Sequence, residues 1–452
     1  MRRGERAHAA AAAGERIEDA AARGVGQRRK DRVELVVRIL NHSVEYKLPS
    51  PGLVNPCMDV LASLVVSGLL WQGGTEIAVG GGERGPWRQN ESRYRYVDDP
   101  AVAIDGRGGV AVAWVDQARK EVFFQRSGRT INVSRSPGTF SWLPRLITSP
   151  GRPEMFHLLW QEVIFSGGSH GGDILYARST DDGKTFSAPL NLSNSVSGDG
   201  KGRTSREHWH NGSLDIAAGA DEAVYAAWTE YEGRLLLAVS GDGGNGFSAS
   251  RPIAGNDAQP ARAPSLAIGP DRTLYLAWTT GDIYIARSTD GGASFGEPFV
   301  VRRSGAYADA PKIAVDSRNT LHLSFSENGH VVYARSSDGA RSFEAPRTIA
   351  AGTFPSLDVD ARGGVYLLWE LARGLGLALS RSFGNDFSVT SPLPRSAGDA
   401  PNGNLQDKLT DKLAVNADGE VAVVNSSFHD GRRSRVWLLR ARPAGRFSLG
   451  PG

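Results

Sequence analysis

Short runs in which apolar residues alternate with small or polar ones recur along residues 94–452, and turn residues bound each run. One such unit begins at Pro100, passes a turn at Asp105 and Gly108, and ends at Trp114. Alternation over about four to eight residues is typical of a strand with one buried face, and an Asp–Gly pair is typical of a tight turn. The unit therefore predicts two antiparallel strands. Later copies end at Trp160, Trp228, Trp278, Phe325 and Trp369, and a last copy at Asn425 lacks the aromatic residue.

A third apolar run follows each unit and leads, in four copies, into a repeated turn of the pattern Ser-x-Asp. The acids of these four turns are Asp181, Asp242, Asp290 and Asp338. A degenerate fifth copy of the pattern begins at Ser380. An Asp in this place can accept hydrogen bonds from the backbone N–H groups of its own turn, and the glycines of the pattern permit a positive φ. We therefore predict that these acids hold hairpins closed and have a structural role.

Three strands before the turn and one after it make four strands per unit, and seven units follow one another from about residue 94. Radial repetition of four-stranded units is the architecture of a β-propeller. The prediction is an all-β fold with a propeller of seven four-stranded blades. Six blades with a degenerate extra hairpin are the alternative. The large aromatic residue at the same strand position in most units is predicted to fill the core between blades.

The chain divides into three parts. Residues 1–57 are rich in Ala and Arg and are expected to be helical or disordered, residues 58–93 hold an apolar segment and a linker, and residues 94–452 form the propeller. The apolar run from Val60 to Trp71 is shorter than the roughly 20 residues that span a bilayer, so no membrane span is expected. Its length fits the apolar region of a signal peptide, and it fits equally a strand that closes the last blade.

Composition excludes several classes of function. The formal net charge of +3 is small, so we expect no nucleic-acid partner. The single cysteine, Cys57, excludes an intrachain disulfide. No nucleotide, haem or flavin motif is visible, and His208 and His210 have no third ligand nearby in the sequence, so neither a cofactor nor a metal is expected. The propeller is expected to be a monomer.

The functional face is expected to lie opposite the repeated turns, where the loops between second and third strands meet the loops between blades. These loops are rich in carboxylates, arginine, tyrosine and histidine. Five acids that follow the second-strand aromatic residue form a ring. They either cap loops and pair with neighbouring arginines, or supply the two carboxylates that glycoside hydrolysis needs. The five are Asp116, Glu162, Glu230, Glu327 and Glu370.

The turn Ser179-Thr-Asp181-Asp-Gly183-Lys-Thr185-Phe186 and its copies resemble the Asp-box, or BNR, repeats of the sialidase (neuraminidase) superfamily. The resemblance covers about residues 94–450. It implies a secreted or periplasmic protein that acts on extracellular glycans. In sialidases three arginines grip the substrate carboxylate, a tyrosine–glutamate pair is the nucleophile of a retaining mechanism, and an aspartate is the acid/base. The nearest match to the family's first arginine motif is Tyr94-Arg95-Tyr96.

Candidate site residues follow from this resemblance and from loop position. Arg95 and Arg262 are candidates for binding an anion, Asp99 for the acid/base, and Glu230 with Tyr307 for the nucleophilic pair. Further substrate-binding candidates in the same loops are Trp142, His208, Trp209, His210 and Tyr231.

Three functions stay open from the sequence. An exo-α-sialidase-type hydrolase predicts arginines that converge at one channel mouth. A non-catalytic glycan-binding propeller predicts exposed aromatic side chains there. A protein-interaction scaffold predicts a large exposed apolar patch.

Overall fold

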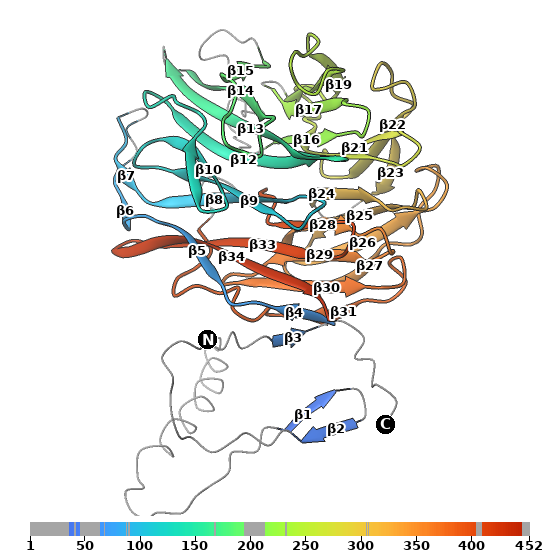
Figure 1. The fold of residues 1–452 in the computed structure, drawn as a ribbon. Coiled ribbons are helices and arrows are strands. Elements are labelled where there is room, and N and C mark those ends of the chain that lie inside the picture. Colours follow the sequence, from blue (N-terminus) through green and yellow to red (C-terminus); the bar gives the residue numbers. More distant parts are fainter. Residues whose placement is uncertain are drawn as a thin grey trace, which may run out of the picture. The chain divides into compact units, whose positions relative to one another are not determined.

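The computed structural model describes residues 36–39, 42–45, 64–66, 68–86, 88, 91–166, 169–193, 213–230, 233–303, 305, 307–403 and 409–444. The chain forms two compact units, Met1–Val60 and Leu61–Gly452. In the first unit, β1 (Val36–Ile39) pairs antiparallel with β2 (His42–Glu45). The second unit contains seven blades arranged around an axis (Figure 1). The predicted seven-bladed propeller is therefore confirmed.

Each of the first six blades consists of four consecutive antiparallel strands. Blade 1 has β8 (Val97–Ile104), β9 (Val110–Asp116), β10 (Glu121–Arg126) and β11 (Arg129–Asn132); blade 2 has β12 (Phe140–Ser149), β13 (Arg152–Ser166), β14 (Ser169–Ser179) and β15 (Leu190–Asn191); blade 3 has β16 (Leu214–Ala218), β17 (Val224–Thr229), β18 (Leu235–Ser240) and β19 (Arg251–Ala254). Blade 4 has β20 (Arg262–Ile268), β21 (Leu274–Thr279), β22 (Ile283–Ser288) and β23 (Phe299–Arg302); blade 5 has β24 (Ala308–Val315), β25 (Leu321–Glu327), β26 (His330–Ser336) and β27 (Arg347–Ala351); blade 6 has β28 (Thr353–Val359), β29 (Val365–Glu370), β30 (Leu375–Ser380) and β31 (Ser388–Thr390). A short pair, β6 (Glu83–Arg84) with β7 (Tyr94–Arg95), precedes blade 1.

Blade 7 is completed from the other end of the chain. Its strands β32 (Leu413–Val415), β33 (Val421–His429) and β34 (Arg432–Pro443) are joined by β4 (Leu69–Trp71) and β5 (Thr75–Val79), which both pair with β34, and β3 (Leu64–Val66) pairs with β4. Leu69 and Trp71 are buried in the blade's core. Each first strand contacts the first strand of the next blade, and β32 contacts β8, so the ring is closed. Leu69–Trp71, the end of the apolar run, thus forms a closing strand.

The first strands of five blades share a β-bulge. In each, a residue with positive φ stands directly before a proline, and the pairing register shifts there. Proline has no N–H for the ladder, and a bulge is where a strand tolerates that loss. The pairs are Asp99-Pro100, Leu143-Pro144, Ala263-Pro264, Ala310-Pro311 and Phe354-Pro355.

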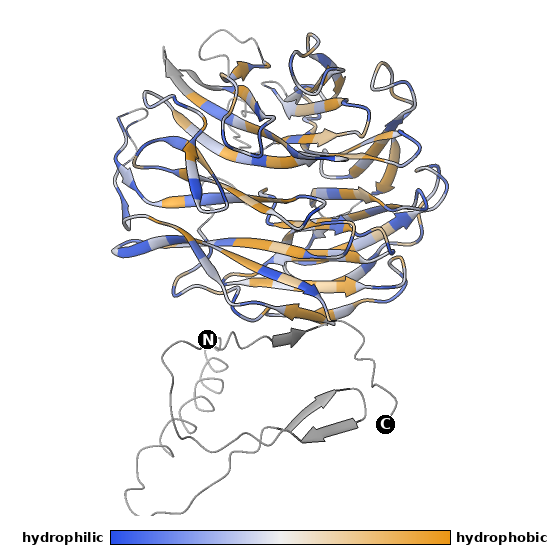
Figure 2. Ribbon diagram, viewed as in Figure 1, coloured by the Kyte–Doolittle hydropathy of each residue, from blue (hydrophilic) through white to orange (hydrophobic). Residues whose placement is uncertain are grey.

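The core lies between the blades, where buried hydrophobic residues of neighbouring sheets form clusters. Figure 2 shows hydrophobic residues along the strands. The repeated aromatic residues at the ends of the second strands are all buried, with at most 5% of their surface exposed. They are Trp114, Trp160, Trp228, Trp278, Phe325 and Trp369. The prediction that these rings fill the core is confirmed, and it leaves them unavailable for stacking on a sugar.

Each repeated turn is closed by its own Ser and Asp side chains. Asp290 Oδ1 accepts hydrogen bonds from Ser288 Oγ (2.7 Å) and Ser294 N (2.9 Å), while Ser288 Oγ accepts one from Gly292 N (2.8 Å). The hydroxyl groups of Ser288 and Ser294 hold the pKa of Asp290 well below its usual range. The turns at Asp181, Asp242 and Asp338 repeat this geometry.

Arginines on the third strands tie one blade to the turn of the next. Arg178 Nη1 donates to Gly243 O at 2.8 Å, and Arg287 Nη1 donates to Gly339 O at 3.2 Å. Arg335 Nη1 donates in the same way to Phe383 O at 2.6 Å. These side chains occupy the Arg-Ser positions that precede the turns, so the Arg-Ser-x-Asp sequence closes its own turn and holds the following blade.

Candidate functional site

The ring of acids at the ends of the second strands is satisfied by local partners. Glu327 takes two hydrogen bonds from Arg302, both at 2.9 Å, and Glu162 accepts one from Ser141 Oγ at 2.7 Å. The other members behave alike: Asp116 caps Ala118 N, Glu230 lies 3.6 Å from Arg234 Nη2, and Glu370 pairs with Lys412 at 2.6 Å. Each of the five acids thus has a local partner that it caps or pairs with, and a catalytic role for any of them stays a prediction.

The three residues predicted to be catalytic lie in three different blades. Asp99 is in β8 of blade 1, Glu230 follows β17 of blade 3, and Tyr307 precedes β24 of blade 5. Asp99 has no exposed surface, whereas Tyr307 exposes 54% of its surface. The sialidase resemblance implies a tyrosine–glutamate nucleophile and an aspartate acid/base, and these groups must reach the same sugar. The catalytic assignment of this trio therefore stays a prediction.

Arg262 and Tyr307 are two predicted site residues that the structure brings together. The Arg262 guanidinium carbon lies 5.0 Å from the centre of the Tyr307 ring, across the junction of blades 4 and 5. This cation–π pair occupies the face of the inter-blade loops. The roles predicted for Arg262 and Tyr307 stay predictions.

Trp142 lies within β12 and not in a loop, and only 4% of its surface is exposed. Its Nε1 donates a hydrogen bond to Gln117 Oε1 (3.3 Å), and Gln117 Nε2 donates to Asp98 Oδ1 (3.0 Å). The prediction that Trp142 lies in a loop is therefore wrong. Its indole instead belongs to a buried chain of hydrogen bonds. His208, Trp209, His210 and Tyr231 lie outside the described residues.

A cavity of about 270 Å³ lies on the axis and is lined by first-strand residues of all seven blades. Its lining includes the charged groups of Asp215, Lys312 and Asp411, and the charges of Lys312 and Asp411 act on Asp215. Asp411, which precedes β32, pairs with Lys312 of blade 5 and with Arg145 of blade 2, whose Nε lies 3.3 Å from Asp411 Oδ2. Blades 2, 5 and 7 are not neighbours, so these ion pairs cross the axis.

The carboxyl groups that line the cavity differ in the direction of their pKa shifts. Although burial opposes ionisation, Lys312 and Arg145 hold the pKa of Asp411 below its usual range. Burial raises the pKa of Asp215, and it raises that of Asp358 to about 7. Asp358 Oδ2 accepts a hydrogen bond from Val415 N (2.7 Å) and so joins blade 6 to blade 7.

Replacing Asp358 by Asn is expected to flatten the pH dependence of stability. The pKa of Asp358 is raised from an unfolded value of about 3.9, so the folded state retains a proton that the unfolded state releases. This contribution to stability is complete below about pH 4 and is lost as the pH rises through about 7. Thermal midpoints at pH 5.5 and 8.5 should differ less for Asp358→Asn than for the wild type. The exposed Asp418→Asn is the control, and an equal pH response in Asp358→Asn and wild type would contradict the assignment.

A groove of about 380 Å³ lies at blade 1 on the face opposite the repeated turns. It is lined by two loops: the chain before β8 and the β9–β10 loop, which joins second and third strands. Arg93, Arg95 and Lys120 supply three positive charges against the one negative charge of Glu91, and Gln117 accepts the hydrogen bond from Trp142. The Arg95 side chain is 70% exposed, with Nε 3.4 Å from Glu83 Oε2. Such arginines can bind a carboxylate with both guanidinium nitrogens.

Arg95 was predicted from the sequence to bind an anion, whereas Lys120 was not among the predicted site residues. The available signal was the Arg119-Lys120 pair at the tip of a loop on the expected face. Lys120 Nζ lies 5.0 Å from the centre of the Phe140 ring, which fixes the ammonium group beside the groove. No helix among the described residues has the length and apolar character to cross a membrane, and no group of three or more acidic, His or Cys side chains in those residues could hold a metal.

Comparison with known proteins gives no family model and no curated protein that matches the sequence. Solved structures do match. A protein of unknown function from Dyadobacter fermentans is 11% identical, with 84% of this chain and 100% of that chain covered and a TM-score of 0.47. An ulvan lyase of polysaccharide lyase family PL25 is 10% identical, with 80% and 95% covered and a TM-score of 0.49. The sialidase of Trypanosoma rangeli is 12% identical, with 69% and 56% covered and a TM-score of 0.45. The neighbours thus include enzymes that act on glycans, while the fold of this chain rests on its own strand pairing.

Proposed function

We propose that this protein is a propeller that binds anionic glycans in the groove at blade 1. The observation that carries the proposal is the convergence of Arg93, Arg95 and Lys120, from two loops, on one open groove of the predicted functional face. A carboxylate or sulfate on a sugar matches this charge, and arginine forks bind such groups with charge-assisted hydrogen bonds. The resemblance of the repeated turns to sialidase repeats, seen in the sequence, agrees with a glycan as the partner.

The exposed apolar residues argue against a protein-interaction scaffold. Among the described residues, the large hydrophobic side chains that are exposed belong to four different blades. They are Val79, Leu190, Tyr307 and Val389. Scattered single residues are ordinary on a soluble surface, whereas a docking surface needs a contiguous patch.

Replacing Arg95 by Ala is expected to weaken binding of anionic glycans about tenfold or more, because a charge-assisted hydrogen bond to a carboxylate is lost. The measurement is binding of the full chain to an array of sialylated, uronate-containing, sulfated and neutral glycans. Wild type should prefer anionic glycans, and that preference should weaken with salt.

Arg129→Ala, an exposed arginine on the outer strand β11 of the same blade, is the matched control and should bind as wild type does. Equal binding of anionic and neutral glycans, or an unchanged affinity of Arg95→Ala, would refute the groove. Turnover of an aryl sialoside that is lost in Tyr307→Phe would instead favour the hydrolase.

A further inference from the structure

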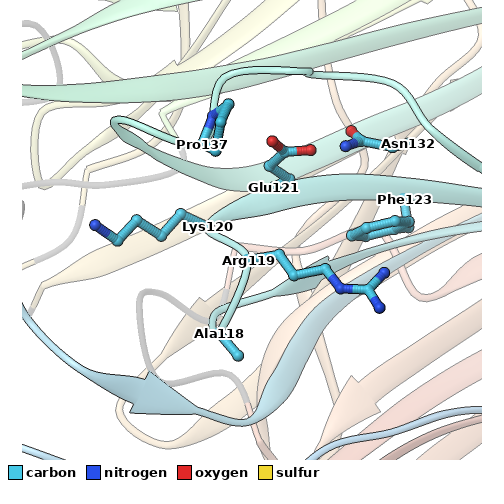
Figure 3. Close-up of a pocket in the computed structure, with 7 residues that line it drawn as sticks. All are labelled: Ala118, Arg119, Lys120, Glu121, Phe123, Asn132 and Pro137. Atoms are coloured by element: carbon cyan, nitrogen blue, oxygen red, sulfur yellow. The ribbon is translucent and has the colours of Figure 1, made fainter.

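A second pocket of about 400 Å³ adjoins the groove at blade 1 and shares Ala118 and Lys120 with it. Its other lining residues come from β10, β11 and the loops beside them (Figure 3). They are Arg119, Glu121, Phe123, Asn132 and Pro137. A ligand in the groove can therefore extend into this pocket past Lys120.

Glu121 is the unusual member of the pocket. Only 4% of its surface is exposed, and its Oε2 has no hydrogen-bond partner among the described residues. Burial raises the pKa of the Glu121 carboxyl group, although Arg119 opposes the rise. Glu162, a buried acid within β13, the neighbouring blade's second strand, has hydroxyl and indole donors. A buried acceptor without a donor is costly, and Glu121 lines the pocket, so its carboxyl group is a place for a donor from a ligand.

The surroundings of Glu121 combine polar, cationic and aromatic groups. Figure 3 shows its carboxyl group on the same side as Pro137 and Asn132, with Arg119 extending past Phe123. The Arg119 guanidinium carbon lies 5.2 Å from the centre of the Phe123 ring, and its Nε lies 3.6 Å from Asp116 Oδ2. Asn132 Oδ1 accepts a hydrogen bond from Arg135 N at 3.2 Å, which orients the amide.

We infer that this pocket recognises the hydroxyl groups of an acidic sugar, with the Glu121 carboxyl group accepting hydrogen bonds from them while Lys120 and the arginines hold the sugar's acid group. The inference rests on the proposed function and adds its ligand class: a saccharide whose units carry both free hydroxyl groups and a carboxylate. A sulfated polymer that lacks free hydroxyl groups would satisfy the groove and leave Glu121 unpaired.

Calorimetric titration of the full chain with tri-galacturonate tests the inference. Glu121→Gln should weaken binding about tenfold, because one acceptor oxygen becomes an N–H donor group. Its thermal midpoint should stay equal to that of the wild type or rise, because a buried unpaired carboxylate is removed. Glu344→Gln, an exposed acid paired with Arg335, is the control and should leave binding unchanged.

The outcomes separate the two claims. If wild type binds and Arg95→Ala weakens the binding while Glu121→Gln does not, the pocket inference fails and the groove stands. If wild type does not bind tri-galacturonate or any other anionic glycan, the proposed function fails. Asn132, in β11, lines the same pocket, so Asn132→Ala should also weaken binding. This variant replaces Glu121→Gln in the test if Glu121→Gln does not fold. Unchanged affinity in the folded variants of this pocket would overturn the inference.

Discussion

Replacing Asp411 by Ala is expected to lower the free energy of unfolding by about 3–5 kcal/mol, because removal of one partner from a buried ion pair leaves the opposite charge uncompensated. Two cations depend on Asp411 here: the Arg145 side chain is 2% exposed and that of Lys312 is 11% exposed. Both lie on inner strands of the ring, while the Asp411 side chain is 28% exposed and lines the axial cavity.

Urea denaturation followed by tryptophan fluorescence measures this effect. The matched control is Asp418→Ala in the same blade, since the Asp418–Arg362 pair has both side chains 70% exposed. Exposed pairs contribute about 0–1 kcal/mol, so the control should change stability little. Adding Lys312→Met to Asp411→Ala should recover part of the loss by removing one unpaired cation. Equal, small effects of Asp411→Ala and Asp418→Ala would contradict the axial role of this network.

Replacing Gly244 by Ala is expected to destabilise the propeller by about 2–4 kcal/mol. Gly244 has φ +80°, which disfavours any residue with a Cβ, and the added Cβ would lie 2.7 Å from Tyr176 Cζ and closer still to its hydroxyl oxygen. Tyr176 cannot easily move, because its hydroxyl group is 2.6 Å from His157 Nδ1 in the core of blade 2. The substitution would therefore separate the turn of blade 3 from blade 2.

Gly241 offers a control within the same turn. A Cβ added there would meet no atom within 4 Å. Thermal denaturation should therefore show a large drop for Gly244→Ala and almost none for Gly241→Ala. Similar midpoints for the two variants would mean that the turn does not fix the position of one blade on the next.

The blade count could be predicted because its signals are local. The Ser and Asp of each repeated turn bond within about four residues, and the aromatic residue that ends each second strand is fixed by period-two alternation. Neither signal depends on how distant parts of the chain meet. The number of blades therefore follows from the sequence, whereas the strands β4 and β5 that complete blade 7 lie before residue 94, where the predicted propeller begins.

The axial network could not be predicted, because it joins residues far apart in the chain. Arg145 Nη2 donates to Leu409 O, and Asp411 meets Lys312 across the ring. The strand pairing aligns blade 7 with blade 5. Leu413 pairs with Val423 in blade 7, and Ile313 pairs with Leu323 in blade 5, so Leu413 and Ile313 occupy equivalent positions. Asp411 therefore stands where blade 5 has Pro311, and only the closed ring shows what that acid contacts.

The candidate site was predicted in part. The opposite face and Arg95 followed from blade topology, since loop position is set by strand order. Trp142 was assigned to a loop because the bulge between Trp142 and Arg145 breaks the alternation of β12. Glu121 Oε2 is unpaired because no donor of the described residues comes within hydrogen-bonding distance. A sequence pattern cannot predict the absence of such a contact.

A crystal structure of the full chain with tri-galacturonate tests the central claim most directly. Binding in the groove, with a sugar carboxylate against Arg93, Arg95 or Lys120, is the predicted result. A saccharide bound instead in the axial cavity, or against Arg262 and Tyr307 on blades 4 and 5, would contradict the assignment of the glycan site to blade 1.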